Sequence, residues 1–399
     1  MMSYTNIISH KEPFMEFSPI RKFKRYWRVA VLANIRDDSQ PKPEGVPPDA
    51  FADFDHIETI EKIQAAIESD GHETKFLMAD RTLPQKIVEY QPDICLNIAE
   101  GLGGDAREAH IPALLEMLGI PYTGSRVLTN AISLDKTLTK RIWRDRRLPV
   151  APFQEFLTGE DALRPDLKFP LFVKPAREGT GMGVDAKAIV KNENELRERV
   201  KWVINAYQQP ALVETFLSGR EFTVGVMGRA DSKLYSRHPE WYDDKDGFHR
   251  FPILELDATR SVTPKVYSQA AKAKEVGEQG APDYMCPANV EPELEKKLKH
   301  FAWRAHILLN ALDISRTDIR LDDEGNPRLM EINTLPGLTP GFSDLCVIAN
   351  AEGISYRDLI LEILYLGASR YKLLEPATFG PFSMETLKPR KVRESVIVR

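Results

Sequence analysis

Residues 315–333 read SRTDIRLDDEGNPRLMEIN, two alternating runs on either side of a turn-forming cluster. Alternating runs around a group of Asp, Gly, Asn and Pro predict a β-hairpin. If the turn is centred in the cluster, Asp318 lies opposite Glu331 and Arg316 lies opposite Asn333. Side chains alternate along a strand, so each strand presents one set on this face: Arg316, Asp318 and Arg320 on the first, and Leu329, Glu331 and Asn333 on the second.

Two facing carboxylates repel each other unless a cation neutralises them. Carboxylate and amide oxygens are the ligands of Mg²⁺, so Asp318, Glu331 and Asn333 form a candidate site for Mg²⁺, with Mn²⁺ as the alternative ion. Arg316 and the backbone N–H of Gly337 are candidates to stabilise a developing oxyanion beside the metal. The competing interpretation is a solvated strand face with two salt bridges, and the Gly337 loop favours the metal site over it.

Residues 169–184 read FPLFVKPAREGTGMGV, an apolar strand that runs into a glycine-rich loop. Lys174 ends the strand, and the glycines let backbone N–H groups approach a phosphate closely. The loop lacks the G-x-x-x-x-G-K-[ST] spacing, so a P-loop or Rossmann assignment is poor. By itself the loop is equally consistent with a plain tight turn. Lys136, at an expected helix start, is a further phosphate candidate, although a lone lysine is usually solvated.

A third segment, residues 211–222, reads ALVETFLSGREF. Glu214 ends a strand, Phe216 and Leu217 can cover a flat base, and Glu221 can reach a ribose hydroxyl. Ordinary core packing is the competing interpretation for the two apolar residues.

Strand–helix alternation in the first part of the chain predicts an α/β domain with a mostly parallel sheet. Its expected strands and helices are residues 29–33, 57–69, 73–78, 93–98 and 111–118. Further strands are expected at 169–174, 186–190 and 211–216, and helices at 135–143, 193–207, 292–312 and 356–369. Residues 232–282 are expected to form hairpins and a mobile loop. The basic, aromatic residues 21–28 are expected to form a solvated arm, with contact to an anionic surface as the alternative.

Composition excludes several classes of protein. A net charge of −5 argues against bulk nucleic-acid binding. Three widely separated cysteines argue against a disulfide framework and a structural zinc site. The chain shows no signal-peptide pattern and no apolar run of about 20 residues, so we expect a cytoplasmic protein without a membrane span.

Taken in order, residues 119–125, 133–136, 173–179, 214–221, 284–288 and 330–339 resemble the ATP-grasp superfamily, and within it the D-alanine–D-alanine ligases. The resemblance covers roughly residues 92–372 and implies a three-domain ATP-grasp fold with an N-terminal α/β domain. The expected division is an extension at 1–27, domains at 28–132, 133–213 and 214–372, and a basic tail at 373–399. ATP would lie between the second and third domains.

The resemblance also implies roles for individual residues. Arg316 and Gly337 would serve the tetrahedral intermediate, and Lys272 would be a phosphate-binding lysine on a mobile loop. The metal would be held by Asp318, Glu331 and Asn333. The nucleotide would be bound by Lys136, Lys174, Glu178, Gly179, Thr180, Gly181, Gly183, Glu214, Phe216, Leu217 and Glu221.

The departures from the family concern the substrate. Glu100 stands where the family has a histidine, Ala273 where it has a tyrosine, and Phe342 where it has a serine, and residues 34–39 lack the family's glutamate. We expect an ATP-dependent carboxylate–amine ligase acting on small amino-acid substrates, with D-Ala–D-Ala the default product. The alternatives are a ligase for another amino acid or metabolite carboxylate, a non-catalytic nucleotide-binding protein, and an ATP-grasp carboxylase or phosphotransferase. Dimers are common in the family, which leaves a homodimer open.

Overall fold

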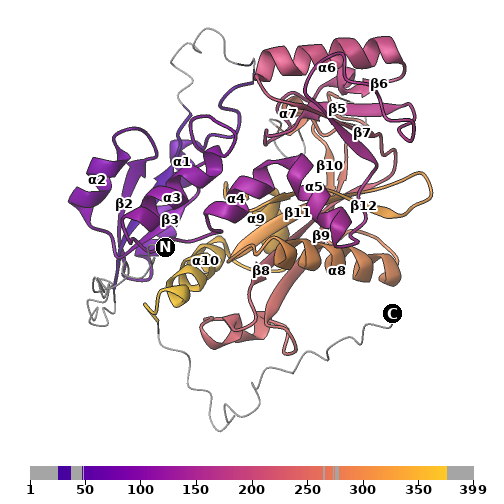
Figure 1. The fold of residues 1–399 in the computed structure, drawn as a ribbon. Helices are drawn as coiled ribbons and strands as arrows, with labels where there is room; N and C mark the ends of the chain where they lie inside the picture. Colours follow the sequence, from indigo (N-terminus) through magenta and orange to yellow (C-terminus); the bar gives the residue numbers. More distant parts are fainter. Residues whose placement is uncertain are drawn as a thin grey trace, which may run out of the picture.

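The computed structural model describes residues 26–36, 47, 49–263, 266–272, 274 and 278–374. The expected extension up to residue 25 and the basic tail after residue 374 lie outside the described residues. The described chain contains three sheets, one in each of three successive parts of the sequence (Figure 1). The domain boundaries at 28, 133 and 214 remain predictions.

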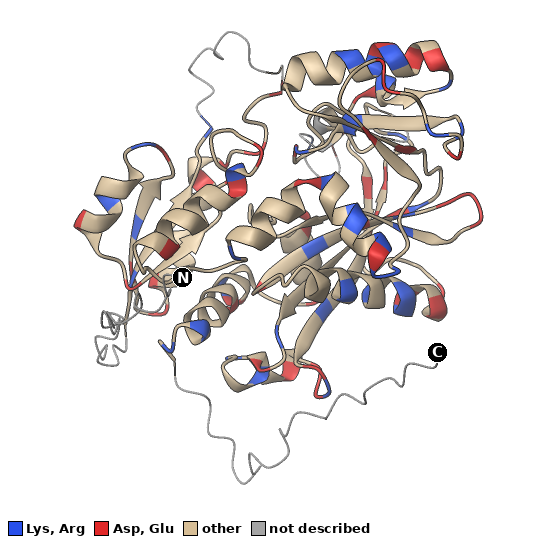
Figure 2. Ribbon diagram, viewed as in Figure 1, with Lys and Arg blue, Asp and Glu red and all other residues tan. Residues whose placement is uncertain are grey.

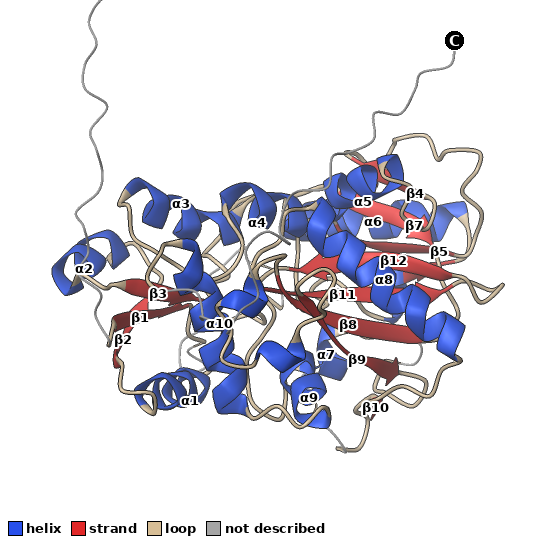
Figure 3. Cartoon of the chain, turned by 90° about the horizontal axis from the view of Figure 1, so that it is seen from below, coloured by secondary structure: helices blue, strands red, loops and turns tan. Residues whose placement is uncertain are grey.

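The first sheet is parallel and three-stranded, which confirms the expected α/β architecture. Its strands, in the order β2-β1-β3, are β1 (Arg28–Ala33), β2 (Glu73–Met78) and β3 (Ile94–Asn97). Parallel neighbours need crossover connections, and these contain α1 (Ile57–Glu68) and α2 (Leu83–Tyr90); α3 (His110–Met117) follows β3. Figure 3 shows α1 on one side of the sheet and α2 and α3 on the other. Both faces are therefore covered, and β1 and β3 are almost entirely buried, whereas the edge strand β2 is partly exposed.

The second sheet is four-stranded and antiparallel, in the order β4-β7-β5-β6. Its strands are β4 (Phe153–Phe156), β5 (Leu171–Pro175), β6 (Ile189–Val190) and β7 (Ala211–Thr215). The helices of this part are α4 (Val127–Leu134), α5 (Lys136–Asp145) and α6 (Glu193–Tyr207). The prediction of a strand at 186–190 was wrong for residues 186–188, which form a 3₁₀ turn (Ala186–Ala188). Asp185 caps this turn, because its side chain accepts the Lys187 N–H at 2.8 Å.

The third sheet is five-stranded and antiparallel, in the order β10-β9-β8-β11-β12. Its strands are β8 (Glu221–Gly228), β9 (Phe248–Asp257), β10 (Asp283–Met285), β11 (Ile314–Leu321) and β12 (Pro327–Asn333). The helices of this part are α7 (Gln269–Lys272), α8 (Pro292–Leu308), α9 (Asp344–Ala351) and α10 (Tyr356–Arg370). Short 3₁₀ turns occur at Arg107–Ala109, Ser232–Leu234 and Pro239–Trp241. Charged residues of both signs gather on the outer faces of α6 and α8 (Figure 2).

The β11–β12 hairpin has the predicted register where the candidate site lies: Asp318 pairs with Glu331 and Arg316 with Asn333. The prediction that Leu329 shares the Glu331 face was wrong. The register shifts after Asp318, so that Ile319 pairs with Leu329 and Met330 is the extra residue of a bulge. Leu329 is therefore buried in the core with Ile319.

Residues 232–282 contain more regular structure than expected, because the ten-residue strand β9 runs through them. Pro252 lies inside this strand, and proline normally argues against one. The register between β8 and β9 shifts at this point, since Val224 pairs with Ile253 but Val226 pairs with Arg250. Pro252 thus lies in a bulge, where its missing N–H breaks no ladder hydrogen bond.

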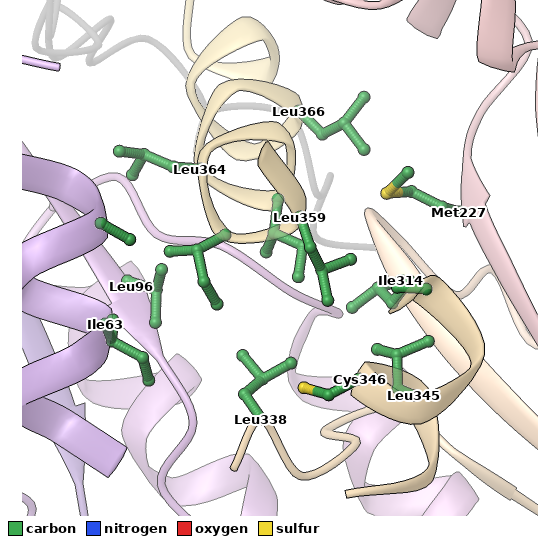
Figure 4. Close-up of a cluster of buried hydrophobic side chains, with 14 of the residues drawn as sticks. Ile63, Leu96, Met227, Ile314, Leu338, Leu345, Cys346, Leu359, Leu364 and Leu366 are labelled. Carbon is green, nitrogen blue, oxygen red and sulfur yellow. The ribbon is translucent and has the colours of Figure 1, made fainter. Parts of the chain in front are cut away.

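Helix α10 joins the first sheet to the third through one apolar core (Figure 4). Leu359 and Leu364 of α10 pack in the same cluster as Ile63 of α1 and Ile314 of β11. Trp27 also belongs to this core and is only 4% exposed, so the expected solvated arm does not include it. In the described part of the chain no helix is both long and apolar enough to cross a membrane.

Candidate active site

A pocket opens between the second and third sheets, and we call it the inner pocket. It collects residues that the sequence places more than 190 positions apart, from Lys136 to Glu331. The predicted site residues that line it are Lys136, Lys174, Glu178, Gly181, Glu214, Phe216, Leu217, Glu221, Asp318 and Glu331. The fold therefore brings most of the predicted nucleotide and metal residues to one place.

Buried charges in the inner pocket are arranged as alternating lysines and glutamates. The Lys174 Nζ lies 3.2 Å from Glu214 and 3.6 Å from Glu331, and the Lys136 Nζ lies 3.5 Å from Glu331. Burial alone would lower the pKa of Lys174, but Glu214 and Glu331 outweigh burial and raise it. Burial would likewise raise the pKa of Glu214, but Lys140 and Lys174 lower it. Lys174 is thus held as a cation facing the pocket.

Local structure fixes where Lys136 points. It is the first residue of α5, directly after Asp135, whose carboxylate accepts the Leu138 N–H at 2.8 Å. This N-cap sets the start of the helix. The Lys136 ammonium then donates to the carbonyl oxygen of Glu178, the first residue of the glycine-rich loop. The helix start and the loop are thereby held together at the pocket.

An aromatic pair forms another wall of the inner pocket. The rings of Phe172 and Phe216 lie 6.3 Å apart between centroids, with an angle of 24° between their planes. Leu217 lies beside them and is buried, while Glu221 pairs with Arg320 at 3.3 Å. A flat apolar wall next to a carboxylate suits a heteroaromatic ring that is joined to a hydroxylated sugar.

The end of the hairpin carries a second charged group. The Arg316 guanidinium lies 3.2 Å from Asp318 and 3.0 Å from Asp344, the first residue of α9. Asp318 also accepts the Thr223 hydroxyl at 2.6 Å. Burial would lower the pKa of Arg316, but the two carboxylates raise it. Arg316 is therefore a fixed cation at the edge of the pocket.

The donor set at this position fits a hard divalent cation. Asp318 and Glu331 are cross-strand partners that line the inner pocket, and Asn333 follows two residues later on the same strand as Glu331. Two carboxylates and an amide oxygen are the groups that Mg²⁺ binds in proteins. Arg316 forms an ion pair with Asp318, and Lys136 and Lys174 form ion pairs with Glu331.

A second pocket, which we call the acidic pocket, adjoins the first, and Tyr267 lines both. Arg316, Asn333, Gly337 and Phe342 line it from the third part of the chain. Further residues on its wall are Asp53, Asp55, Glu100, Glu108, Gly179, Thr180, Tyr284 and Asp344. The predicted oxyanion residues Arg316 and Gly337 therefore both line the acidic pocket, and Arg316 contacts Asp318 of the inner pocket.

Some predicted residues lie elsewhere. Gly183 lines neither pocket; its N–H donates to Asp49 at 2.7 Å. A Cβ on Gly183 would lie 2.5 Å from Pro175, and its φ is +70°, so a side chain is strained there for two reasons. Lys272 is the last residue of α7, and Ala273 lies outside the described residues. Roles for these positions remain predictions.

Sequence reasoning missed several residues of the site. Lys140 is fully buried, pairs with Glu214 at 2.9 Å and donates to the Leu329 carbonyl at 3.1 Å. Its spacing of four from Lys136 on one helix was a usable signal. Asp344 carried no comparable signal, because only the fold brings it to Arg316. The same holds for Tyr267, whose hydroxyl lies 2.9 Å from that of Tyr284.

Comparisons with known proteins agree with this geometry. Residues 142–365 match the family model for the D-ala D-ala ligase C-terminus. The chain is 30% identical to an uncharacterized protein, y4sG, of Sinorhizobium fredii, over 86% of this chain and 98% of that protein. It is 32% identical to a D-alanine–D-alanine ligase of Erythrobacter litoralis, over 76% and 86%. The solved structure of the D-alanine–D-alanine ligase from Bacillus anthracis complexed with ATP superposes on this chain with a TM-score of 0.63. The superposition covers 87% of this chain and 99% of that one, at 23% sequence identity, and shows a shared fold.

Proposed function

The chain belongs to the D-alanine–D-alanine ligase family, and on this premise we propose that it is an ATP-dependent carboxylate–amine ligase. The observation that carries the proposal is the meeting of two pockets at one hairpin. The inner pocket holds lysines, glutamates and an aromatic wall, and the acidic pocket holds Arg316 and Gly337. Such a pair of sites can place a triphosphate next to a carboxylate substrate.

We assign the inner pocket to ATP. Phe172, Phe216 and Leu217 would cover the base, and Glu221 would face the ribose. Lys136 and Lys174 would contact the phosphates, exchanging their present contacts with Glu331 for phosphate oxygens. Asp318, Glu331 and Asn333 would hold Mg²⁺, which neutralises charge on the phosphates when it is bound.

The proposed reaction has two steps. An oxygen of the substrate carboxylate attacks the γ-phosphorus; a P–O bond forms, the bond to the β-phosphate oxygen breaks, and ADP leaves. The amine of the second substrate then attacks the acyl carbon, and the amine loses a proton as the C–O bond to phosphate breaks. Arg316 and the Gly337 N–H would stabilise the oxyanion formed between these events. The product is an amide, with ADP and phosphate.

Asp344 would act as a positioning residue in this scheme. It holds Arg316 at 3.0 Å from the side opposite Asp318, so the guanidinium is aimed before substrate arrives. Preorganised donors of this kind stabilise developing charge without reorganising during the reaction. Lys140 acts one step further away, because it supports Glu214, which in turn contacts Lys174.

A coupled ADP-release screen over D- and L-amino acids, singly and in pairs, tests the proposal. We expect ADP formation that depends on an amino acid and yields equal amounts of amide and phosphate. ADP formation with none of the amino acids by a folded protein would refute the ligase function. ADP formation that requires bicarbonate instead of an amine would point to a carboxylase on the same scaffold.

A further inference from the structure

The wall of the acidic pocket that comes from the N-terminal part of the chain carries four carboxylates. Asp53 and Asp55 come from the segment before α1, Glu100 from the loop after β3, and Glu108 from the 3₁₀ turn Arg107–Ala109. None of these four positions belongs to the predicted nucleotide or metal set. Their chemistry therefore bears on the amino-acid substrate, which the family resemblance leaves undecided.

The arginines near these carboxylates already have partners. The Arg107 guanidinium lies 2.7 Å from Asp53 and 3.3 Å from Glu178, and it also donates to the Arg177 carbonyl at 2.9 Å. Arg316 is held by Asp318 and Asp344. Arg36 lines the pocket and has a partner of its own. His56 lies at the rim and is exposed.

Three carboxylates are left without such a partner. Within the described part of the chain, no donor or cation lies within hydrogen-bond or ion-pair distance of the side chains of Asp55, Glu100 or Glu108. Glu108 is only 6% exposed and lines the pocket. A buried carboxylate without a partner is costly, so Glu108, which shares the pocket with the half-buried Asp55 and Glu100, is stabilised when a cation binds there.

The spacing of these groups argues for an organic cation. Among the described residues, no three His, Cys, Asp or Glu side chains are close enough together to hold one metal ion. Carboxylates spread along a wall instead match ammonium or guanidinium groups at separate positions on one ligand. The α-ammonium of an ordinary amino acid supplies only one positive charge, which is fewer than the carboxylates on this wall.

Resting on the ligase function proposed above, we infer that one of the two joined amino acids carries a second positive charge on its side chain. Asp55, Glu100 and Glu108 would bind its cationic groups. The substrate class is therefore a diamino or guanidino acid rather than alanine. Glu100 is the residue that replaces the family's histidine, which places the change in substrate at the same wall.

Matched pairs of substrates test this inference. Initial rates of ADP release are measured with ornithine, lysine and arginine, and with the neutral, size-matched norvaline, norleucine and citrulline, each in D and L form. We expect kcat/KM for the cationic member to exceed that for its neutral partner by at least about tenfold, the value of one charge-assisted contact. Equal rates for the two members would overturn the inference and leave the ligase function standing.

Two variants locate the effect. Glu108→Gln and Glu100→Gln keep the side-chain shape and are expected to reduce the preference for cationic substrates. Glu61→Gln, an exposed carboxylate of α1 outside the pocket wall, should leave the preference unchanged. An unchanged preference in both pocket variants would also overturn the inference.

If no substrate pair gives turnover, a binding measurement distinguishes failure of the ligase function from failure of the cationic-substrate inference. Calorimetry with lysine and norleucine, on wild type and Glu108→Gln, requires no reaction. Tighter binding of lysine that is lost in the variant supports the cationic site even without ADP release. Binding of Mn²⁺ alone that competes with lysine and is lost in Glu108→Gln would overturn it in favour of a metal site.

Discussion

The Lys174 ammonium lies 3.6 Å from the Glu331 carboxylate, although the two residues come from different sheets. Lys174 belongs to β5 of the four-stranded sheet, and Glu331 belongs to β12 of the five-stranded sheet. Lys136, from α5, lies 3.5 Å from the same carboxylate. Glu331 therefore bridges the parts of the chain that form the inner pocket, and it is also a proposed metal ligand.

Glu331→Gln should abolish turnover while nucleotide binding partly survives. The amide keeps the shape of the side chain but removes a charge that would neutralise the metal and counterbalance two lysines. Metal stabilisation of phosphate charge is needed most in the transition state, so we expect kcat to fall by about 100-fold or more. ADP release and equilibrium binding of a fluorescent ATP analogue measure the two effects.

Glu324→Gln is the matched control for this variant, because Glu324 is exposed in the turn of the same hairpin. Its activity should equal that of wild type. A fully active Glu331→Gln protein would refute the metal assignment.

Lys140→Met should destabilise the protein and weaken ATP binding. Lys140 is fully buried against Glu214, and removing one member of a buried pair typically costs about 3–5 kcal/mol. Glu214 keeps Lys174 as a partner, so the loss should lie near the lower end of that range. Lys201→Met removes an exposed pair with Glu160 and should cost far less, because solvent screens exposed charges. Urea unfolding compares the two; similar losses would contradict the role assigned to the buried pair.

Asp344→Asn separates positioning from binding. The change removes one of the two carboxylates that hold Arg316, but Asp344 does not line the inner pocket. We expect kcat to fall by roughly 10–100-fold, as for other groups that orient a catalytic side chain, while the KM for ATP stays nearly constant. A variant with unchanged kcat would show that Asp318 alone orients Arg316.

The centre of the hairpin was predictable from sequence because strand alternation is a local property. The pairing of Asp318 with Glu331 follows from counting residues around one turn. The bulge at Met330 was not predictable in this way, because alternation gives no sign of an extra residue on one strand. Strand β9 lies in the stretch that was expected to form hairpins, but its bounds were not predictable, since Pro252 argues against a strand until the bulge that accommodates it is known.

The acidic pocket could not be predicted from local patterns. Asp55 and Glu108 are 53 residues apart, and neither lies in a periodic segment that marks its surroundings. The resemblance identified Glu100 as an altered position, but only the fold shows that it shares a wall with the other two carboxylates. Long-range juxtaposition is a product of tertiary packing, which a motif does not encode.

Trp27→Ala should destabilise the protein strongly, although the sequence suggested that this residue lies in a solvated arm. Its ring stacks on His72 with 4.8 Å between centroids, and its backbone N–H donates to the His72 Nδ1 at 3.1 Å. Truncating a buried tryptophan typically costs about 3–5 kcal/mol. Leu128→Ala, at a residue that is 69% exposed, should cost much less. Equal midpoints in thermal unfolding would place Trp27 outside the core.

The affinity for a cationic amino acid should fall as the pH is lowered from 8 to 6. Burial, and then Asp53, raise the pKa of Asp55 to about 7. Burial raises the pKa of Glu108 to about 7. The charges of Arg107 and Lys136 lower this pKa, and those of Asp53 and Glu178 raise it further. Both carboxyls are therefore largely ionised at pH 8 and largely protonated at pH 6, and only the ionised form binds a cation well.

Binding of that amino acid near pH 7 should consequently release protons, because the bound cation favours the ionised carboxylates. Calorimetry in two buffers with different ionisation enthalpies measures the number released. Glu108→Gln should release fewer protons and show a flatter pH dependence, whereas norleucine, with a neutral side chain, should release fewer than lysine in wild type. Proton uptake on binding lysine would contradict the assignment of these carboxylates, since it requires the bound state to hold more protons than the free one.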